Sequence, residues 1–220
     1  MRMMGIGHNV TMPSRLIPLF PLQVVVFPRT DLPLHIFEER YKEMVGAAIR
    51  DTTEFGVVLA KENGIVNVGC TVSVDRVVQT YEDGRMDIVT RGRRRFEIAS
   101  LDEELSYLRA EVNFFDDEDF VPTPAEVRDL AIQSYSELRK LTSTGGRGEA
   151  DLGDPQLSFQ IAQGLPDLDF LNTLLGQRSE TGRLKRINQY LAEYIPQKRA
   201  IEHVRAVAPT NGCGGRPVGI

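Results

Sequence analysis

Residues 68–78 read VGCTVSVDRVV, and this stretch decides the fold class. Val68, Cys70, Val72 and Val74 occupy every second position, with small or polar residues between them. A period of two puts one row of side chains on one face of a strand, so the stretch predicts a β-strand with one buried face. Cys70 lies in the apolar row, and we interpret it as a small core residue rather than a reactive thiol.

The same period dominates from Leu16 to about Phe115. Asn63-Gly64 and Asp83-Gly84 supply residues that tolerate positive φ, and they predict turns between strands. A single helix is expected over residues 38–50. Further strands are predicted at residues 15–20, 23–27, 55–61, 85–91, 94–100 and 107–115.

The pattern changes after the acidic connector FFDDEDFVPTP at residues 114–124. Thr123-Pro124-Ala125-Glu126 predicts a helix start with a capping box, and apolar spacing predicts further helices near residues 157–162, 168–175 and 184–195. Pro196 is expected to bend or end the last helix.

The sequence therefore predicts an α+β fold in two parts. A twisted, antiparallel, barrel-type β lobe with one helix occupies residues 14–117, and a helical bundle occupies residues 118–207. We expect residues 1–13 and 208–220 to be disordered tails.

Composition narrows the class of protein. Hydrophobic residues make up 41% of the 220-residue chain and charged residues 26%, which is ordinary for a globular protein. No apolar run approaches the roughly 20 residues that cross a bilayer, and the first residues do not resemble a secretory signal. Two distant cysteines, Cys70 and Cys213, do not form a disulfide framework. We expect a cytoplasmic protein.

The stretch LHIFEERY at residues 34–41 holds one of three histidines. His35 followed by Glu38 and Glu39 approaches the HxxEH zinc pattern, but the second histidine is missing, so we expect no metal site. In the structural interpretation, His35 ends a strand and the two glutamates occupy the first turn of a helix, where negative charge complements the helix dipole.

Four arginines at residues 91 and 93–95, followed by Phe96, suggest a surface that contacts phosphates. On a regular strand Arg91, Arg93 and Arg95 face one way, which makes them candidate anion-binding residues. The net charge of −5 counts against a general nucleic-acid binder.

No GxSxG, Walker or HExxH motif is present. We therefore expect no catalytic residues, no cofactor and no enzymatic activity.

The stretch IPLFPLQVVVFPRTDLPLHIFEERYKEMV at residues 17–45 resembles the opening of the amino-terminal domain of Lon proteases. The later stretch VGCTVSVDRVVQTYEDGRMDIVTRGRRRFEI is similar to a further pattern of that domain, as are the helical stretches DPQLSFQIAQGL and LLGQRSETGRLKRINQYL. The resemblance covers residues 15–200 and implies a PUA-like lobe followed by a helical bundle. We expect the AAA+ ATPase and the protease domain of Lon to be absent from 220 residues.

The resemblance also implies a role in binding protein segments. Our first hypothesis is a non-enzymatic module that binds unfolded or exposed polypeptide, as an adaptor or substrate recruiter for a separate protease. We expect its surface to include His35, Phe37, Arg40 and Tyr41, or an exposed strand edge. The alternative is an RNA-binding PUA-like protein that uses Arg91–Arg95. The sequence leaves the oligomeric state open.

Overall fold

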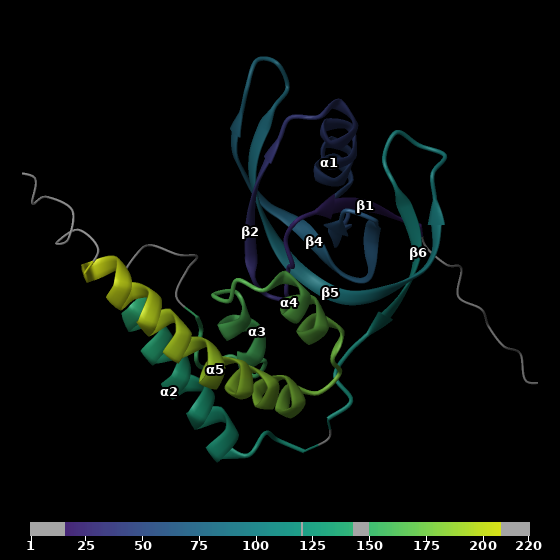
Figure 1. Ribbon diagram of the computed structural model, residues 1–220. Coiled ribbons are helices and arrows are strands. Elements are labelled where there is room, and N and C mark those ends of the chain that lie inside the picture. The colour runs from purple at the N-terminus through teal and green to yellow at the C-terminus, as the bar shows by residue number, and fades with distance from the viewer. Residues whose placement is uncertain (1–15, 120, 143–149, 208–220) are drawn as a thin grey trace, which may run out of the picture. The chain divides into compact units, whose positions relative to one another are not determined.

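The computed structural model describes residues 16–119, 121–142 and 150–207, with side chains to residue 204 (Figure 1). The predicted tails, residues 1–13 and 208–220, lie outside the described residues. The chain divides into two compact units. The first contains the residues up to 116 together with 167–176, and the second contains 117–166 and the residues from 177 onward.

Six strands form the sheet of the first unit. They are β1 (Ile17–Leu22), β2 (Asp31–Ile36), β3 (Phe55–Lys61), β4 (Gly64–Thr80), β5 (Met86–Asp102) and β6 (Arg109–Phe115). Their order is β2-β5-β4-β3-β1-β6, and β6 also pairs with β5, so that five strands close on themselves as a barrel. Only the β1–β3 pairing is parallel among the described strands. The predicted α+β class with a mostly antiparallel sheet is confirmed.

The barrel core centres on Phe96, which is fully buried with Ile17, Leu19, Val58 and Ala110 around it. Helix α1 (Glu39–Asp51) packs beside the sheet, and the centre of its Tyr41 ring lies 4.1 Å from the centre of the Phe20 ring. Cys70 is fully buried, as the alternation predicted, and burial raises the pKa of its thiol to about 12.

Residues 23–27 are not a strand, contrary to the prediction. Val25, Val26 and Phe27 are buried in an irregular segment that is held to the sheet at one glycine. Gly92 donates its N–H to the Thr30 carbonyl at 2.9 Å, and its own carbonyl accepts from Arg29 at 2.8 Å. The apolar run thus reflects burial without ladder pairing.

The second unit holds α2 (Ala125–Leu141), α3 (Leu157–Ala162) and α5 (Glu180–Val207). Helices α2 and α5 lie side by side and run in the same direction (Figure 1). Asn188 donates to the Val127 carbonyl in the first half of both helices, and Arg199 pairs with Glu137 further along both. Helix α4 (Leu168–Gly176) belongs to the first unit, although the sequence pattern placed it in the bundle.

Two predicted helix boundaries differ from the structure. Thr123 does not cap α2: Pro124 occupies the N-cap position, and the Thr123 hydroxyl bonds instead to that of Thr181 at 3.0 Å. Pro196 lies inside α5, which continues to Val207. A proline removes a single intrahelical N–H donor, and the exposed Pro196 is accommodated without ending the helix.

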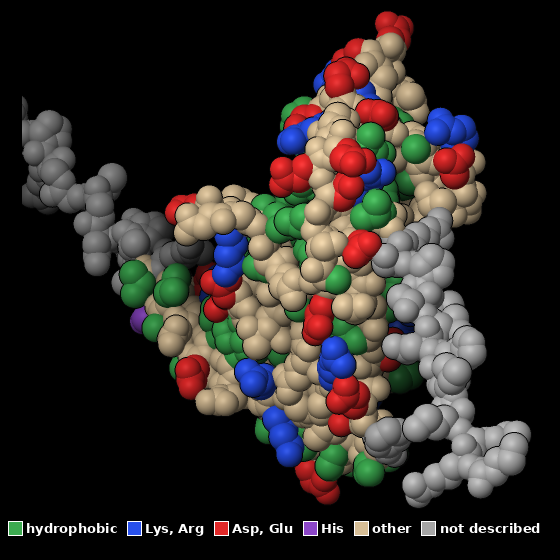
Figure 2. All heavy atoms as spheres, turned by 90° about the vertical axis from the view of Figure 1, so that its right-hand side faces the viewer, with side chains coloured by type: hydrophobic (Ala, Val, Ile, Leu, Met, Phe, Trp, Pro, Cys, Tyr) green, Lys and Arg blue, Asp and Glu red, His purple; other side chains and the backbone are tan. Residues whose placement is uncertain are grey.

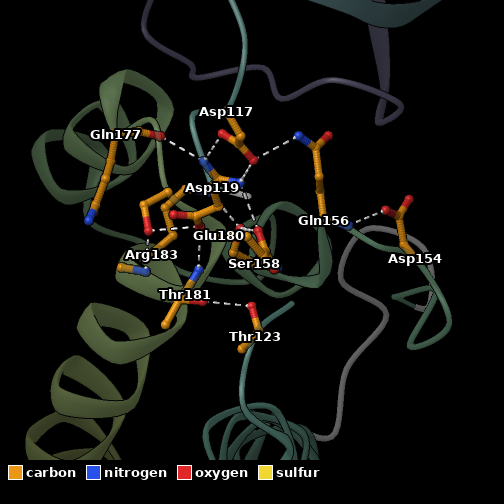
Figure 3. Close-up of polar contacts among 12 residues, drawn as sticks. Asp117, Asp119, Thr123, Asp154, Gln156, Ser158, Gln177, Glu180, Thr181 and Arg183 are labelled. Carbon is orange, nitrogen blue, oxygen red and sulfur yellow. Dashed lines mark hydrogen bonds and ion pairs between the residues drawn. The ribbon is translucent and has the colours of Figure 1, made fainter. Parts of the chain in front are cut away.

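The second unit is organised around Arg183, whose polar contacts Figure 3 shows. Its side chain is fully buried. Its guanidinium donates to both carboxylate oxygens of Asp117 at 2.6 Å and to Glu180 at 2.7 Å. The Ser158 hydroxyl accepts from Nε at 2.8 Å, and the group lies 4.2 Å from the centre of the Phe159 ring. A buried cation is tolerated because paired carboxylates neutralise it and accept its N–H groups.

Substituting Arg183→Ala should lower the free energy of unfolding by about 3–5 kcal/mol, since Asp117 and Glu180 would keep their charges without the cation that neutralises them. Urea denaturation followed by circular dichroism measures the loss. The matched control is Arg186→Ala on the exposed side of α5, which should change stability by less than about 0.5 kcal/mol. Equal losses in both variants would show that Arg183 has no special role.

Gly92 and Gly46 give opposite expectations for the same change to alanine. A Cβ at Gly92 would lie 2.0 Å from the carbonyl oxygen of Phe27, whereas a Cβ at Gly46, in α1, would meet nothing within 4 Å. We expect Gly92→Ala to cost about 1–3 kcal/mol through overpacking. Gly46→Ala should gain about 0.5–1 kcal/mol, because alanine loses less backbone entropy in a helix. Thermal unfolding of both variants tests the pair, and a stabilising Gly92→Ala would contradict the close approach.

Candidate functional site

The chain turns sharply from β2 into α1 at residues 37 and 38. Ile36 is buried, whereas its neighbours His35 and Phe37 are exposed to solvent. Glu38 occupies the N-cap position of α1 and Glu39 its first turn. The predicted first-turn position is confirmed for Glu39, whereas Glu38 precedes the first turn and its side chain makes no capping hydrogen bond.

His35 is held by a carboxylate on the neighbouring strand. Its Nδ1 lies 2.6 Å from Oδ1 of Asp87 on β5, and the Tyr81 hydroxyl donates to the other Asp87 oxygen at 2.7 Å. Two hydrogen bonds lower the pKa of Asp87, the larger effect coming from Tyr81 and the smaller from His35. The hydrogen bond between Tyr81 and Asp87 also raises the pKa of Tyr81. This fixes the position of the His35 ring at the exposed surface.

Phe37 is the exposed apolar group of the corner. Its side chain is 60% exposed, and its ring stacks on that of His35 with the ring centres 5.9 Å apart. Arg40 is also at the surface, paired with Glu38 at 2.8 Å. Tyr41 is not available there, because its ring is buried against Phe20. Of the four candidate polypeptide-binding residues, the structure therefore brings three to the surface.

Strand β2 lies at the end of the strand order. In the described part of the chain it pairs with β5 alone, so its other edge carries no strand. Pro33 lies in the middle of β2, opposite Val89. Since proline has no N–H, it is tolerated where that position faces the open edge. The open edge keeps carbonyl acceptors and a reduced set of donors for an incoming chain. We name this edge, with His35, Phe37 and Arg40, the β2 corner.

The sequence reasoning missed two exposed valines on the part of the sheet that β2, β5 and β4 form. Val77 is 42% and Val78 62% exposed on β4. The β4–β5 register shifts between Val77 and Gln79, which places one extra residue in β4. Two consecutive valines in an otherwise alternating strand were the available signal of such a bulge.

The predicted arginine row is broken by another bulge. Val72 pairs with Gly92 and Cys70 with Arg95, so β5 has one more residue than β4 over this interval. Thr71 lies at the bulge and accepts the N–H of Arg94 at 3.1 Å. As a result Arg93 and Arg94 both point outward, whereas Arg95 is buried.

The candidate anion-binding arginines accordingly have different environments. Arg91 pairs with Asp31 at 3.0 Å, and Arg93 donates to the Ser73 hydroxyl at 2.8 Å. The buried Arg95 donates to the Leu175 carbonyl at 3.2 Å and lies over the Phe115 ring. On the face that Figure 2 shows, Lys and Arg side chains are interspersed with Asp and Glu. These observations do not favour a phosphate-binding surface.

Among the described residues, no group of three His, Cys, Asp or Glu side chains is arranged to hold a metal ion. None of the described helices is both long enough and apolar enough to span a bilayer.

The lowered pKa of Asp87 predicts a pH-dependent contribution to stability. The pairing stabilises the folded state above the unfolded-state pKa of about 3.9 and is lost as the pH falls through the lower folded-state pKa. Asp87→Asn should therefore lower the melting temperature at neutral pH, and its difference from the unchanged protein should shrink in acid. Asp75→Asn, on the exposed part of β4, is the control. A difference that is constant with pH would contradict the assignment.

Comparison with known proteins identifies the family. Residues 16–202 match the model of the ATP-dependent protease La (LON) substrate-binding domain. A Lon protease of Parabacteroides distasonis is 26% identical over an alignment of 133 residues that covers 53% of this chain and 16% of that protein. A Lon protease of Anaeromyxobacter dehalogenans is 30% identical over an alignment of 133 residues that covers 57% of this chain and 15% of that protein. The match thus spans only about a sixth of each relative.

Solved structures agree on the fold. A Lon N-terminal domain protein from Xanthomonas campestris superposes with a TM-score of 0.63 at 23% identity, covering 79% of this chain and 96% of that one. The N-terminal domain of the Mycobacterium avium complex Lon protease gives a TM-score of 0.58 at 15% identity, covering 81% and 98%. Since the family model spans most of the chain, the protein belongs to the family of Lon substrate-binding domains.

Proposed function

We propose that this chain is a non-enzymatic module that binds extended, partly apolar polypeptide at the β2 corner. The observation that carries the proposal is an open strand edge beside an exposed aromatic ring. Strand β2 has no second neighbour among the described strands, and Phe37, at its end, is 60% exposed. Family membership supports a role in substrate recognition.

An edge of this kind can bind a chain by main-chain pairing. An extended segment added to a sheet edge gains hydrogen bonds that do not depend on its sequence, while side-chain contacts supply selection. Phe37 would supply such a contact, and the His35 ring supports it from one side. The missing N–H of Pro33 weakens self-association through the same edge, because a second copy of β2 would face one donor fewer.

The proposed role in the cell is to recruit such segments to a separate protease or to act as an adaptor. It rests on the family and on the chemistry of the β2 corner. RNA binding receives no comparable support, because Arg95 is buried and Arg91 is paired with Asp31.

The test is fluorescence anisotropy with a labelled peptide of alternating Val and Thr that carries lysines at its ends. Phe37→Ala should weaken binding about tenfold, because burying an aromatic side chain contributes roughly 1.5–3 kcal/mol when complete and less when partial. Leu101→Ala removes another exposed apolar side chain, on β5, and should leave binding unchanged. Equal losses from the two variants would contradict a specific role of the corner.

Two further arms separate the proposed mode from its rivals. The same peptide with N-methyl groups at alternate residues should bind more weakly, since these groups block main-chain pairing; unchanged affinity would overturn strand addition. Peptide binding should change little between low and high salt. If the chain instead bound a labelled single-stranded RNA, with affinity falling steeply as salt rises, the RNA-binding alternative would replace the proposal.

A further inference from the structure

A hollow of about 370 Å³ lies in the first unit where β1 begins, and none of the residues of the β2 corner lines it. Its lining combines the start of β1, the residues that follow α1, and parts of β4, β5 and β6. Leu16 and Phe114, which are partly exposed, supply apolar walls, and Thr53, Glu54 and Arg94 supply polar groups. This volume is at the lower end of ligand pockets, so it suits a small molecule or a single residue.

Arg94 is held in the hollow without an ionic partner. The bulge in β5 turns its side chain outward, and the guanidinium carbon lies 4.0 Å from the centre of the Phe114 ring. Within the described part of the chain, its guanidinium makes no hydrogen bond or ion pair with another residue. An arginine placed over an aromatic ring keeps a planar set of N–H donors that matches a carboxylate.

Glu54 supplies the opposite charge in the same hollow. It is partly buried, and among the described residues its carboxylate has neither a hydrogen-bond donor nor an ion-pair partner. Glu54 and Arg94 therefore line one hollow without neutralising each other. Helix α1 ends at Asp51, and Thr52 and Thr53, which follow it, also line the hollow. The carboxyl-terminal end of a helix carries partial negative charge, so both this end and the Glu54 carboxylate attract a positively charged group.

These features define the complementary ligand. A phosphate or a lone carboxylate would meet Arg94 but would be repelled by Glu54. A lone amine would meet Glu54 but would be repelled by Arg94. A molecule that carries both an ammonium and a carboxylate satisfies both side chains, and an apolar side chain on it would contact Leu16 and Phe114.

We propose that this hollow binds a free amino acid with an apolar side chain, its carboxylate on Arg94 and its ammonium toward Glu54. The site is independent of polypeptide binding at the β2 corner. It would give the module a small-molecule ligand in addition to its polypeptide ligand.

Isothermal titration calorimetry with leucine, N-acetylleucine and leucinamide tests the assignment on the full chain. Leucine should bind. Both blocked derivatives should bind at least about tenfold more weakly than leucine, because each lacks one of its two charges. Arg94→Gln and Glu54→Gln should each weaken leucine binding by about the same factor.

Arg93→Gln is the matched control, because Arg93 is the adjacent exposed arginine and is engaged by Ser73 outside the hollow. It should leave leucine binding unchanged. Circular dichroism confirms that each variant remains folded. The proposal is overturned if leucine does not bind, if N-acetylleucine binds as tightly as leucine, or if Arg93→Gln and Arg94→Gln have equal effects. Binding of N-acetylleucine alone would identify the site as one for carboxyl-terminal residues of polypeptides and would replace the amino-acid assignment.

Discussion

One strand, β5, is hydrogen-bonded to three others, and the first unit depends on its length and its bend. Its first half pairs with β2 and β4, and its second half pairs with β4 and β6. The bulge between Gly92 and Arg95 allows this change of partners, because an extra residue locally increases the twist of a strand. The same bulge sets the open edge of β2 apart from the closed barrel. The open edge of β2 and the closure of the barrel are therefore both linked to this one irregularity.

Arginine side chains in this protein show how burial decides the role of a charge. Arg183 is enclosed by carboxylates and organises the helices around it. Arg95 is buried with a main-chain carbonyl as acceptor and an aromatic ring beneath it. Arg94, which directly precedes Arg95, remains at the surface, and its guanidinium N–H donors stay available. Residue type alone could not separate these cases, since the difference arises from the register of β4 against β5.

The parts of the fold that the sequence predicted are those where local pattern and tertiary burial agree. The alternation around Cys70 and Val72 correctly predicted a strand, although Gly69 and Thr71 between the apolar residues are buried as well, and Asp83-Gly84 formed the turn between β4 and β5. Predictions failed where a local signal had a different tertiary cause. Val25–Phe27 are apolar because they are covered, and Thr123 bonds to a distant threonine instead of capping its helix.

At the candidate site, Tyr41 shares a helix with exposed residues, yet its ring belongs to the core. An exposed strand edge was expected, but neither its identity as β2 nor the hollow at Arg94 could be predicted, because both depend on which distant strands pair.

The first unit is discontinuous in sequence. The chain leaves it after residue 116 and returns for residues 167–176, which form α4. That short return supplies the Leu175 carbonyl, an acceptor for the buried Arg95, and the buried side chains of Leu171 and Leu174. During synthesis, the β-strands therefore emerge well before a helix that completes their packing. A fragment that ends at residue 116 would contain all six strands, but it would expose apolar surface and would lack the Leu175 carbonyl that accepts from Arg95. Divisions of this protein for separate expression, or for fusion to other domains, must keep the chain intact through Gly176.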